Sequence, residues 1–202
     1  MCDLVVAAPD HVASGIVHRP SLHGRLGRPP LAFRAVTSPL ETCDECGFDG
    51  RAWTEAEALR EISDLPRRYS DAVAGLQDVD LQRRPIAAMW SIAEYVDHVR
   101  EVLFGMRFLL DSALETPGTD LGSAPVPSFE PEPRAVDIDA ALAGVAAEAD
   151  RLSRALGATP PDVWMSHVIV DGDELDVHWI ARHAVHDPTH HLADVVRLRA
   201  AL

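Results

Sequence analysis

Four of the ten histidines lie near the C-terminus, in RHAVHDPTHHLADV, residues 182–195. Residues four apart on an α-helix project from one face about one turn from each other, so His186 and His190 could hold one metal ion. Asp187 and Asp194 fall in the same arc and could orient an imidazole by a hydrogen bond, as metal-binding histidines usually require. We therefore predict a metal site on this helix face, rather than a cluster that only titrates or an accident of composition.

The other members of the cluster have lesser predicted roles. His183 is a neighbour in the same arc, and His191, at its edge, is predicted to be a bystander. Pro188 lies inside the ligand pair, where it removes a backbone hydrogen bond and crowds the residue four before it. Pro188 therefore predicts a kink in the helix. The kink either moves His186 and His190 apart or turns both toward the metal.

A third ligand must come from elsewhere, because catalytic metal sites usually have three protein ligands and one open position. His98, in WSIAEYVDHVREV, lies at the border of an apolar helical stripe, where it could face a cavity between helices. A histidine beside such a stripe is more often a hydrogen-bonded core residue than a ligand. Both interpretations stay open on helical geometry alone.

The stretch CDECG, which contains Cys43 and Cys46, has the spacing of half a zinc knuckle. A closed tetrahedral site needs two further ligands, and the sequence has no second C-x-x-C. Completion would require the N-terminal segment to fold back and supply Cys2, His11, His18 or His23. A structural zinc site, a redox or regulatory dithiol and an exposed turn without metal are the alternatives.

Helical signals begin with two capping boxes, Thr54 with Glu57 and Ser91 with Glu94, which satisfy backbone N–H groups at a helix start. Glu94 is therefore expected to cap its helix. Pro66 predicts a kink or a restart in the first helix. The apolar stripe of the second helix is the most regular in the chain and comprises Ile92, Tyr95, Val96, Val99, Leu103, Met106 and Leu110.

The second half of the chain alternates between loop and helix signals. Residues 115–134 are Pro-rich and predict a loop. A third helix is predicted from about Asp139 to Leu156, with Gly157 as its C-cap. The segment VWMSHVIVDGDELDV alternates around Asp-Gly, which predicts a short β-hairpin, and a fourth helix that carries the histidine cluster is predicted to start near Asp176.

Four amphipathic helices each need a partner to cover an apolar stripe. This requirement predicts an all-α fold, a four-helix bundle with a short β-hairpin before the last helix, over residues 54–202. The bundle is preceded by a C-x-x-C turn segment, 41–53. Residues 1–40 show neither helical nor strand periodicity and are predicted to be a flexible extension.

Composition limits the class of partner. The formal net charge is −14 at pH 7, and nucleic acids and anionic membranes both need a concentrated positive field, so neither is an expected partner. Three cysteines, no apolar stretch of about 18 residues and no export leader predict a cytoplasmic protein without a disulfide framework. Small molecules and metal cations are the expected ligands.

Two motifs together resemble the DinB-like superfamily. The first, W-S-x-x-E-x-x-x-H, ends at His98, and the second, H-[DE]-x-x-H-H, begins at His186. Members of this superfamily include the mycothiol-dependent maleylpyruvate isomerases, the bacillithiol S-transferases and the metal-binding domain of ergothioneine-forming enzymes. The resemblance covers roughly residues 54–202. It implies a four-helix bundle in which histidines matching His98, His186 and His190 bind a divalent metal, usually zinc or nickel.

A tri-histidine site leaves the charge of the metal intact and lowers the pKa of a bound thiol or water. The resemblance favours the thiol, and in a composition similar to that of actinobacteria the thiol would be mycothiol. We therefore predict a thiol-dependent S-transferase, with a non-catalytic metal- or ligand-binding bundle and a metal-dependent hydrolase as alternatives. The expected partners are a small-molecule thiol, an electrophilic substrate and, as an option, a second copy of the chain.

Overall fold

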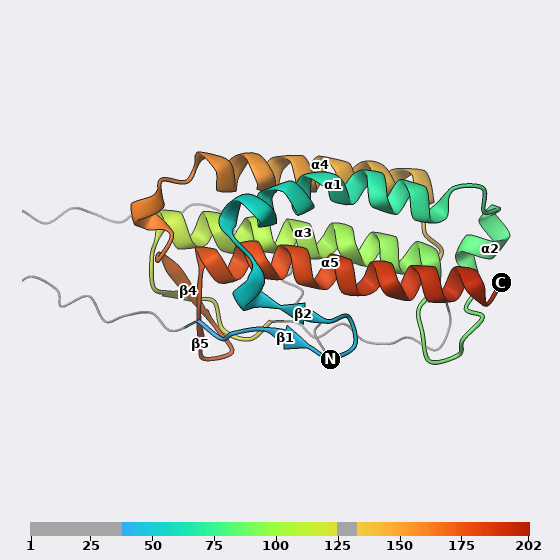
Figure 1. Ribbon diagram of the computed structural model, residues 1–202, viewed down its shortest axis with the longest axis horizontal. Helices are drawn as coiled ribbons and strands as arrows, with labels where there is room; N and C mark the ends of the chain where they lie inside the picture. Colours follow the sequence, from blue (N-terminus) through green and yellow to red (C-terminus); the bar gives the residue numbers. More distant parts are fainter. Residues whose placement is uncertain (1–37, 125–132) are drawn as a thin grey trace, which may run out of the picture.

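The computed structural model describes residues 38–124 and 133–202. The predicted extension, residues 1–40, therefore falls almost entirely outside the described residues. Four long helices dominate the described part, as predicted (Figure 1): α1 (Glu55–Val73), α3 (Ile92–Glu115), α4 (Ile138–Ala158) and α5 (Val177–Ala200). Short elements complete it, and the predicted all-α bundle with a hairpin before the last helix is confirmed.

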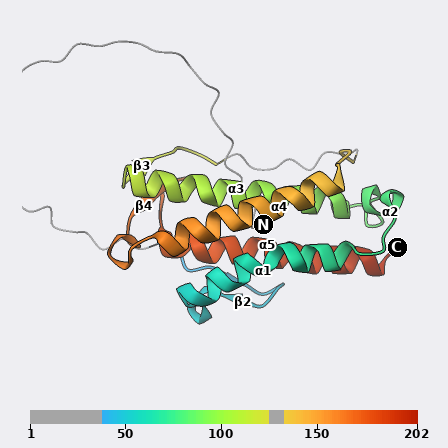
Figure 2. The same ribbon diagram turned by 90° about the horizontal axis from the view of Figure 1, so that it is seen from above.

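The helices pack in a four-membered ring. Both α1 and α3 pack against α4 and α5, so α1 and α3 lie diagonally opposite each other (Figures 1 and 2). Their apolar stripes meet in one core, which removes apolar surface from water. The largest fully buried side chains are Tyr69, Ile62, Leu65, Ile92, Leu103, Met106, Leu109, Leu110, Leu152, Leu156, Ile180 and Leu198.

Side-chain caps define where the long helices begin. Both predicted capping boxes are formed, at Thr54 and at Ser91, and Asp137 and Asp176 cap α4 and α5. The prediction that Gly157 ends the third helix is wrong. The helix runs through it to Ala158, and the cap is Thr159, whose hydroxyl donates to the Ala155 carbonyl.

Neither internal proline interrupts its helix. Pro66 lies inside α1 and Pro188 inside α5, and both helices are continuous, so the predicted restart at Pro66 is wrong. The hydroxyl of Tyr69 donates a 2.6 Å hydrogen bond to the Pro188 carbonyl oxygen. This hydrogen bond connects α1 to α5 at the proline. Because α5 is continuous through Pro188, His186 and His190 lie on the same helix.

The predicted hairpin before α5 is confirmed. Strands β4 (His167–Val170) and β5 (Asp173–Asp176) are antiparallel, and both turn residues, Asp171 and Gly172, have positive φ, as an Asp-Gly hairpin turn requires. A third strand, β3 (Thr119–Asp120), pairs parallel with β4. It lies inside the predicted loop, where a two-residue strand leaves no periodic pattern to detect.

A second, unpredicted hairpin lies beside α5 (Figure 1). It consists of β1 (Thr42–Cys43) and β2 (Phe48–Asp49), and the ring of Phe48 stacks on that of His186 in α5 at 4.3 Å. The remaining short elements are η1 (Gly50–Ala52), α2 (Asp78–Gln82) and η2 (Pro161–Val163). Among the helices of the described residues, none is long and apolar enough to cross a membrane.

Candidate metal centre

One cluster of potential metal ligands lies between α3 and α5. His98 of α3 faces Asp187 and His191 of α5, and their ligand atoms all lie within 4.8 Å of one another. The Asp187 Oδ1 atom lies 3.8 Å from His98 Nε2 and 3.7 Å from His191 Nε2. Two imidazoles and a carboxylate around one point form a ligand set that divalent transition metals accept.

Asp187 is the most unusual residue of this cluster. Its side chain is 0% exposed, and neither carboxylate oxygen accepts a hydrogen bond from any described residue. A buried carboxylate is costly unless a cation or hydrogen-bond donors compensate its charge. The position therefore fits a bound metal cation.

Asp194 orients His191. Its Oδ2 atom lies 3.2 Å from His191 Nδ1, while its Oδ1 atom accepts a 3.0 Å hydrogen bond from Arg197. Because Nδ1 of His191 faces this carboxylate, Nε2 is the nitrogen that faces Asp187. Asp194 therefore contacts His191 at the nitrogen that faces away from Asp187, and its role in orienting a metal ligand stays a prediction.

Aromatic rings line the cluster. The ring of Trp90 lies 4.9 Å from that of His98, and the ring of Tyr95 lies 5.0 Å from that of His191. Burial and the Asp187 carboxylate raise the pKa of Tyr69 well above its usual value, so its hydroxyl remains protonated. Trp90 and Tyr95 therefore contact the two histidines of this cluster.

A second cluster lies between α5 and the β1–β2 hairpin. It comprises Cys43, Cys46, His186 and His190, whose ligand atoms also lie within 4.8 Å of one another. The Sγ atom of Cys43 lies 3.5 Å from Nδ1 of His190. This cluster contains two of the three predicted histidine ligands and both weaker cysteine candidates.

The structure does not bring His98, His186 and His190 together in one cluster. Residues on a helix advance by about 100°, so the pair 187/191 and the pair 186/190 point in different directions. The first pair faces α3, and the second faces the hairpin. The metal-ligand assignment stays a prediction, but the geometry places His98 with Asp187 and His191, which sequence analysis treated as an orienting residue and a bystander.

Glu41 is a site residue that sequence analysis missed. Its Oε1 atom lies 2.6 Å from His183 Nδ1 and 3.6 Å from His186 Nδ1. Although burial raises the pKa of Glu41, the two histidines lower it to about 2. No local signal identifies Glu41, because its partners lie more than 140 residues away along the chain.

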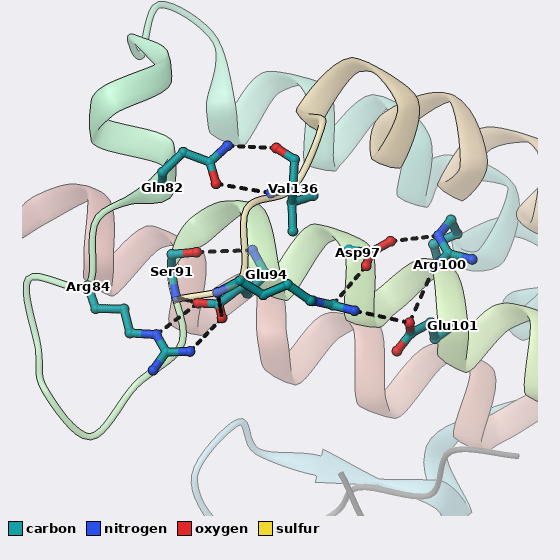
Figure 3. Close-up of polar contacts among 9 residues, drawn as sticks. Gln82, Arg84, Ser91, Glu94, Asp97, Arg100, Glu101 and Val136 are labelled. Atoms are coloured by element: carbon teal, nitrogen blue, oxygen red, sulfur yellow. Dashed lines mark hydrogen bonds and ion pairs between the residues drawn. The ribbon is translucent and has the colours of Figure 1, made fainter. Parts of the chain in front are cut away.

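Glu94, which belongs to the first sequence motif, has a different environment (Figure 3). Its carboxylate accepts hydrogen bonds from Arg84 Nε at 2.9 Å, from Ser91 N at 2.8 Å and from Arg134 N at 2.9 Å. Although burial raises the pKa of Glu94, these donors lower it to about 2. Its role as a helix cap is confirmed, and its hydrogen bonds also tie α3 to the segments before α3 and α4.

Two further histidines lie outside both clusters. His167 is partly buried in β4, and His178, near the start of α5, packs against the ring of Trp164 at 5.0 Å. Neither belongs to a group of potential metal ligands among the described residues. Both side chains are partly buried.

Comparison with known proteins places this architecture in a family. No curated protein matches the chain. Among solved structures, YfiT from Bacillus subtilis, reported as a probable metal-dependent hydrolase with an unusual four-helix bundle topology, matches with a TM-score of 0.61 at 14% sequence identity. The match covers 82% of this chain and 93% of the YfiT chain, and at this identity it shows a shared fold. The model of the DinB superfamily matches residues 61–195, and the chain therefore belongs to the DinB superfamily.

Proposed function

We propose that this protein is a metal-dependent hydrolase that holds a divalent metal with His98, Asp187 and His191. The observation that carries the proposal is the fully buried carboxylate of Asp187, which accepts no hydrogen bond from the described residues and faces two imidazoles. Support also comes from YfiT, a structural relative reported as a probable metal-dependent hydrolase. Three protein ligands leave coordination positions for water and substrate.

A divalent metal bound there would lower the pKa of a bound water and polarise the bond to be hydrolysed. The protein supplies the positions of the ligands. Asp194 holds His191 by its Nδ1 atom and so turns Nε2 toward the site. His98 and His191 are 3% and 7% exposed, and shielding from bulk water strengthens electrostatic interactions inside the site.

A thiol-dependent S-transferase is the second candidate. A metal held by the same ligands would lower the pKa of a bound thiol instead of a bound water. The motifs that end at His98 and begin at His186 resemble those of mycothiol- and bacillithiol-dependent proteins, which favours mycothiol as the thiol. A bundle that binds a metal or ligand without catalysis is the third option, and the assays below separate all three.

Metal content tests the site. Protein purified without a His tag is compared with His98→Ala and Asp187→Asn by elemental analysis after zinc or nickel loading. The matched controls are His167→Ala, a histidine outside both clusters, and Asp173→Asn, an exposed carboxylate in β5. Each site variant is expected to hold one metal equivalent less than the wild type, and the controls to hold the same amount. Equal metal content in wild type and both site variants contradicts the proposed site.

Activity tests the reaction class. The metal-loaded protein is assayed with chromogenic esters, amides and phosphate esters, and separately with mycothiol and monobromobimane. The proposal expects hydrolysis that Asp187→Asn abolishes and Asp173→Asn leaves unchanged. Mycothiol conjugation without hydrolysis supports the transferase instead. A fully loaded protein with no rate above the spontaneous reactions in either assay contradicts both enzymatic proposals and supports a binding function.

A further inference from the structure

The C-x-x-C turn has the local geometry of a zinc knuckle. Gly47 has a φ of 73°, and its backbone N–H donates a 2.8 Å hydrogen bond to the Cys43 carbonyl oxygen. Positive φ suits glycine, because other residues rarely adopt it. The turn therefore resembles the cysteine half of a zinc knuckle, whose two thiolates bind the metal.

Helix α5 presents two histidines to this turn. His186 and His190, one helical turn apart, face Cys43 and Cys46, and the four ligand atoms lie within 4.8 Å of one another. The His186 side chain is 1% exposed, and neither of its ring nitrogens makes a hydrogen bond of regular geometry with the described residues. A buried imidazole in this state has a nitrogen available for a ligand.

Neighbouring carboxylates orient both imidazoles. Glu41 lies 3.6 Å from Nδ1 of His186, which leaves Nε2 to face the cysteines. For His190 the order is reversed, because Nδ1 faces Cys43 while Nε2 lies 3.6 Å from Glu45 and 3.8 Å from Asp194. Carboxylates in such positions fix the orientation of metal-binding histidines.

We infer that Cys43, Cys46, His186 and His190 form a second metal site, a closed structural zinc site of the Cys2His2 class. Two thiolates and two imidazoles complete a tetrahedral zinc shell and leave no position for a substrate. The N-terminal ligands considered from the sequence are not needed, because α5 supplies both histidines. This inference does not rest on the proposed function, since it concerns different ligands.

The site would fasten the β1–β2 hairpin to α5. The hairpin strands contain two residues each, too few to hold the segment in place by backbone pairing. Its other contacts with α5 include the stacking of Phe48 on His186, and Glu41, the residue before β1, contacts His183. Because His186 and His190 precede Asp187 and His191 by one residue, zinc at the hairpin would also fix the helix turn that carries the proposed catalytic ligands.

Spectroscopy on the wild type tests the inference without depending on any variant. X-ray absorption of the zinc-loaded, tag-free protein is expected to show sulfur neighbours at about 2.3 Å and nitrogen neighbours at about 2.0 Å. The cobalt-loaded protein is expected to show a thiolate-to-cobalt charge-transfer band in the near ultraviolet. A zinc shell without sulfur, together with a cobalt protein lacking this band, overturns the inference.

Variants separate the two sites. Cys46→Ser is expected to lose one metal equivalent and the charge-transfer band, and to increase amide hydrogen exchange over residues 42–49. His178→Ala, a histidine on α5 outside both clusters, is the matched control and should change none of these. Asp187→Asn should lose the other metal equivalent and keep the band. If Cys46→Ser keeps the full metal content and the wild-type exchange rate, the structural zinc site is excluded. Cys43 and Cys46 would then form a dithiol or belong to a turn without metal.

Discussion

Glu94 and Asp187 are both buried carboxylates, yet their environments are opposite. Glu94 is 5% exposed and its two oxygens accept hydrogen bonds from Arg84 and from two backbone amides (Figure 3). Asp187 is 0% exposed and its oxygens accept none from the described residues. Glu94 lies one helical turn before His98, the residue that faces Asp187.

The difference distinguishes a carboxylate with a structural role, Glu94, from a carboxylate suited to bind a metal ion, Asp187. A buried charge whose partners lie inside the protein depends on them, and the loss of one partner is costly. A buried carboxylate without hydrogen-bond donors lowers the stability of the folded protein unless a bound cation compensates its charge. The first motif contains Glu94 and His98 together, although one is a structural residue and the other a candidate metal ligand.

The largest expected effect is on metal affinity in Asp187→Asn. Removal of the charged ligand should weaken metal binding by more than about 100-fold, which exceeds the effect of removing an orienting residue. The metal-free variant should be at least as stable as the metal-free wild type, because an uncompensated buried charge is lost. Calorimetric titration and urea unfolding measure the two quantities. A metal-free variant less stable than wild type by several kcal/mol would make Asp187 a structural residue like Glu94.

Glu94→Gln should produce the reverse result. We expect the free energy of unfolding to fall by about 3 kcal/mol, because the Arg84 guanidinium loses its charged partner in a buried position. Metal content should stay at the wild-type level. Urea unfolding and elemental analysis measure these effects, and Glu101→Gln, a partly exposed carboxylate on the same helix, is the control. Loss of metal in Glu94→Gln with unchanged stability would erase the distinction between the two carboxylates.

The same carboxylate predicts a pH dependence of stability. The pKa of Glu94 is about 2, below the ordinary value of 4.5, so the folded state favours the ionised form. The ionised Glu94 therefore contributes up to about 3 kcal/mol to the free energy of unfolding. This contribution is fully present above about pH 5 and is lost as the pH falls toward 2. Unfolding measured on metal-free protein should therefore show wild type and Glu94→Gln converging in stability at acidic pH. A constant difference between them down to pH 3 would contradict this assignment.

A smaller effect is expected for Asp194→Asn. The substitution weakens the hold on His191 Nδ1 without removing a proposed ligand. Metal affinity should fall by about 10-fold, at the lower end of the effect of orienting residues. Competition with a chromophoric chelator measures this change. A loss as large as that of Asp187→Asn would indicate that Asp194 is itself a ligand.

The smallest expected effect belongs to Tyr69→Phe. It removes the 2.6 Å hydrogen bond from the tyrosine hydroxyl to the Pro188 carbonyl oxygen and keeps the buried ring. The free energy of unfolding should fall by about 1 kcal/mol. Thermal unfolding measures it, and a change in metal affinity above a few-fold would show that this hydrogen bond also positions the ligands on α5.

Local sequence determined most of the fold. Capping boxes at Thr54 and Ser91, the regular stripe from Ile92 to Leu110 and the Asp-Gly turn all act over a few residues, so they predict helix starts and the β4–β5 hairpin directly. Short elements escaped prediction, since β1, β2 and β3 contain only two residues each. Their pairing depends on neighbours supplied by the folded chain.

The sequence by itself also determined that potential metal ligands occupy two turns of α5 and that the chain resembles the DinB superfamily. Only the tertiary structure decided which ligands meet. A helical period fixes the direction of a side chain on its own helix, but not the element packed against it. Packing places α3 opposite Asp187 and His191, and the β1–β2 hairpin opposite His186 and His190. The one histidine cluster of the sequence is therefore divided between two groups of potential ligands.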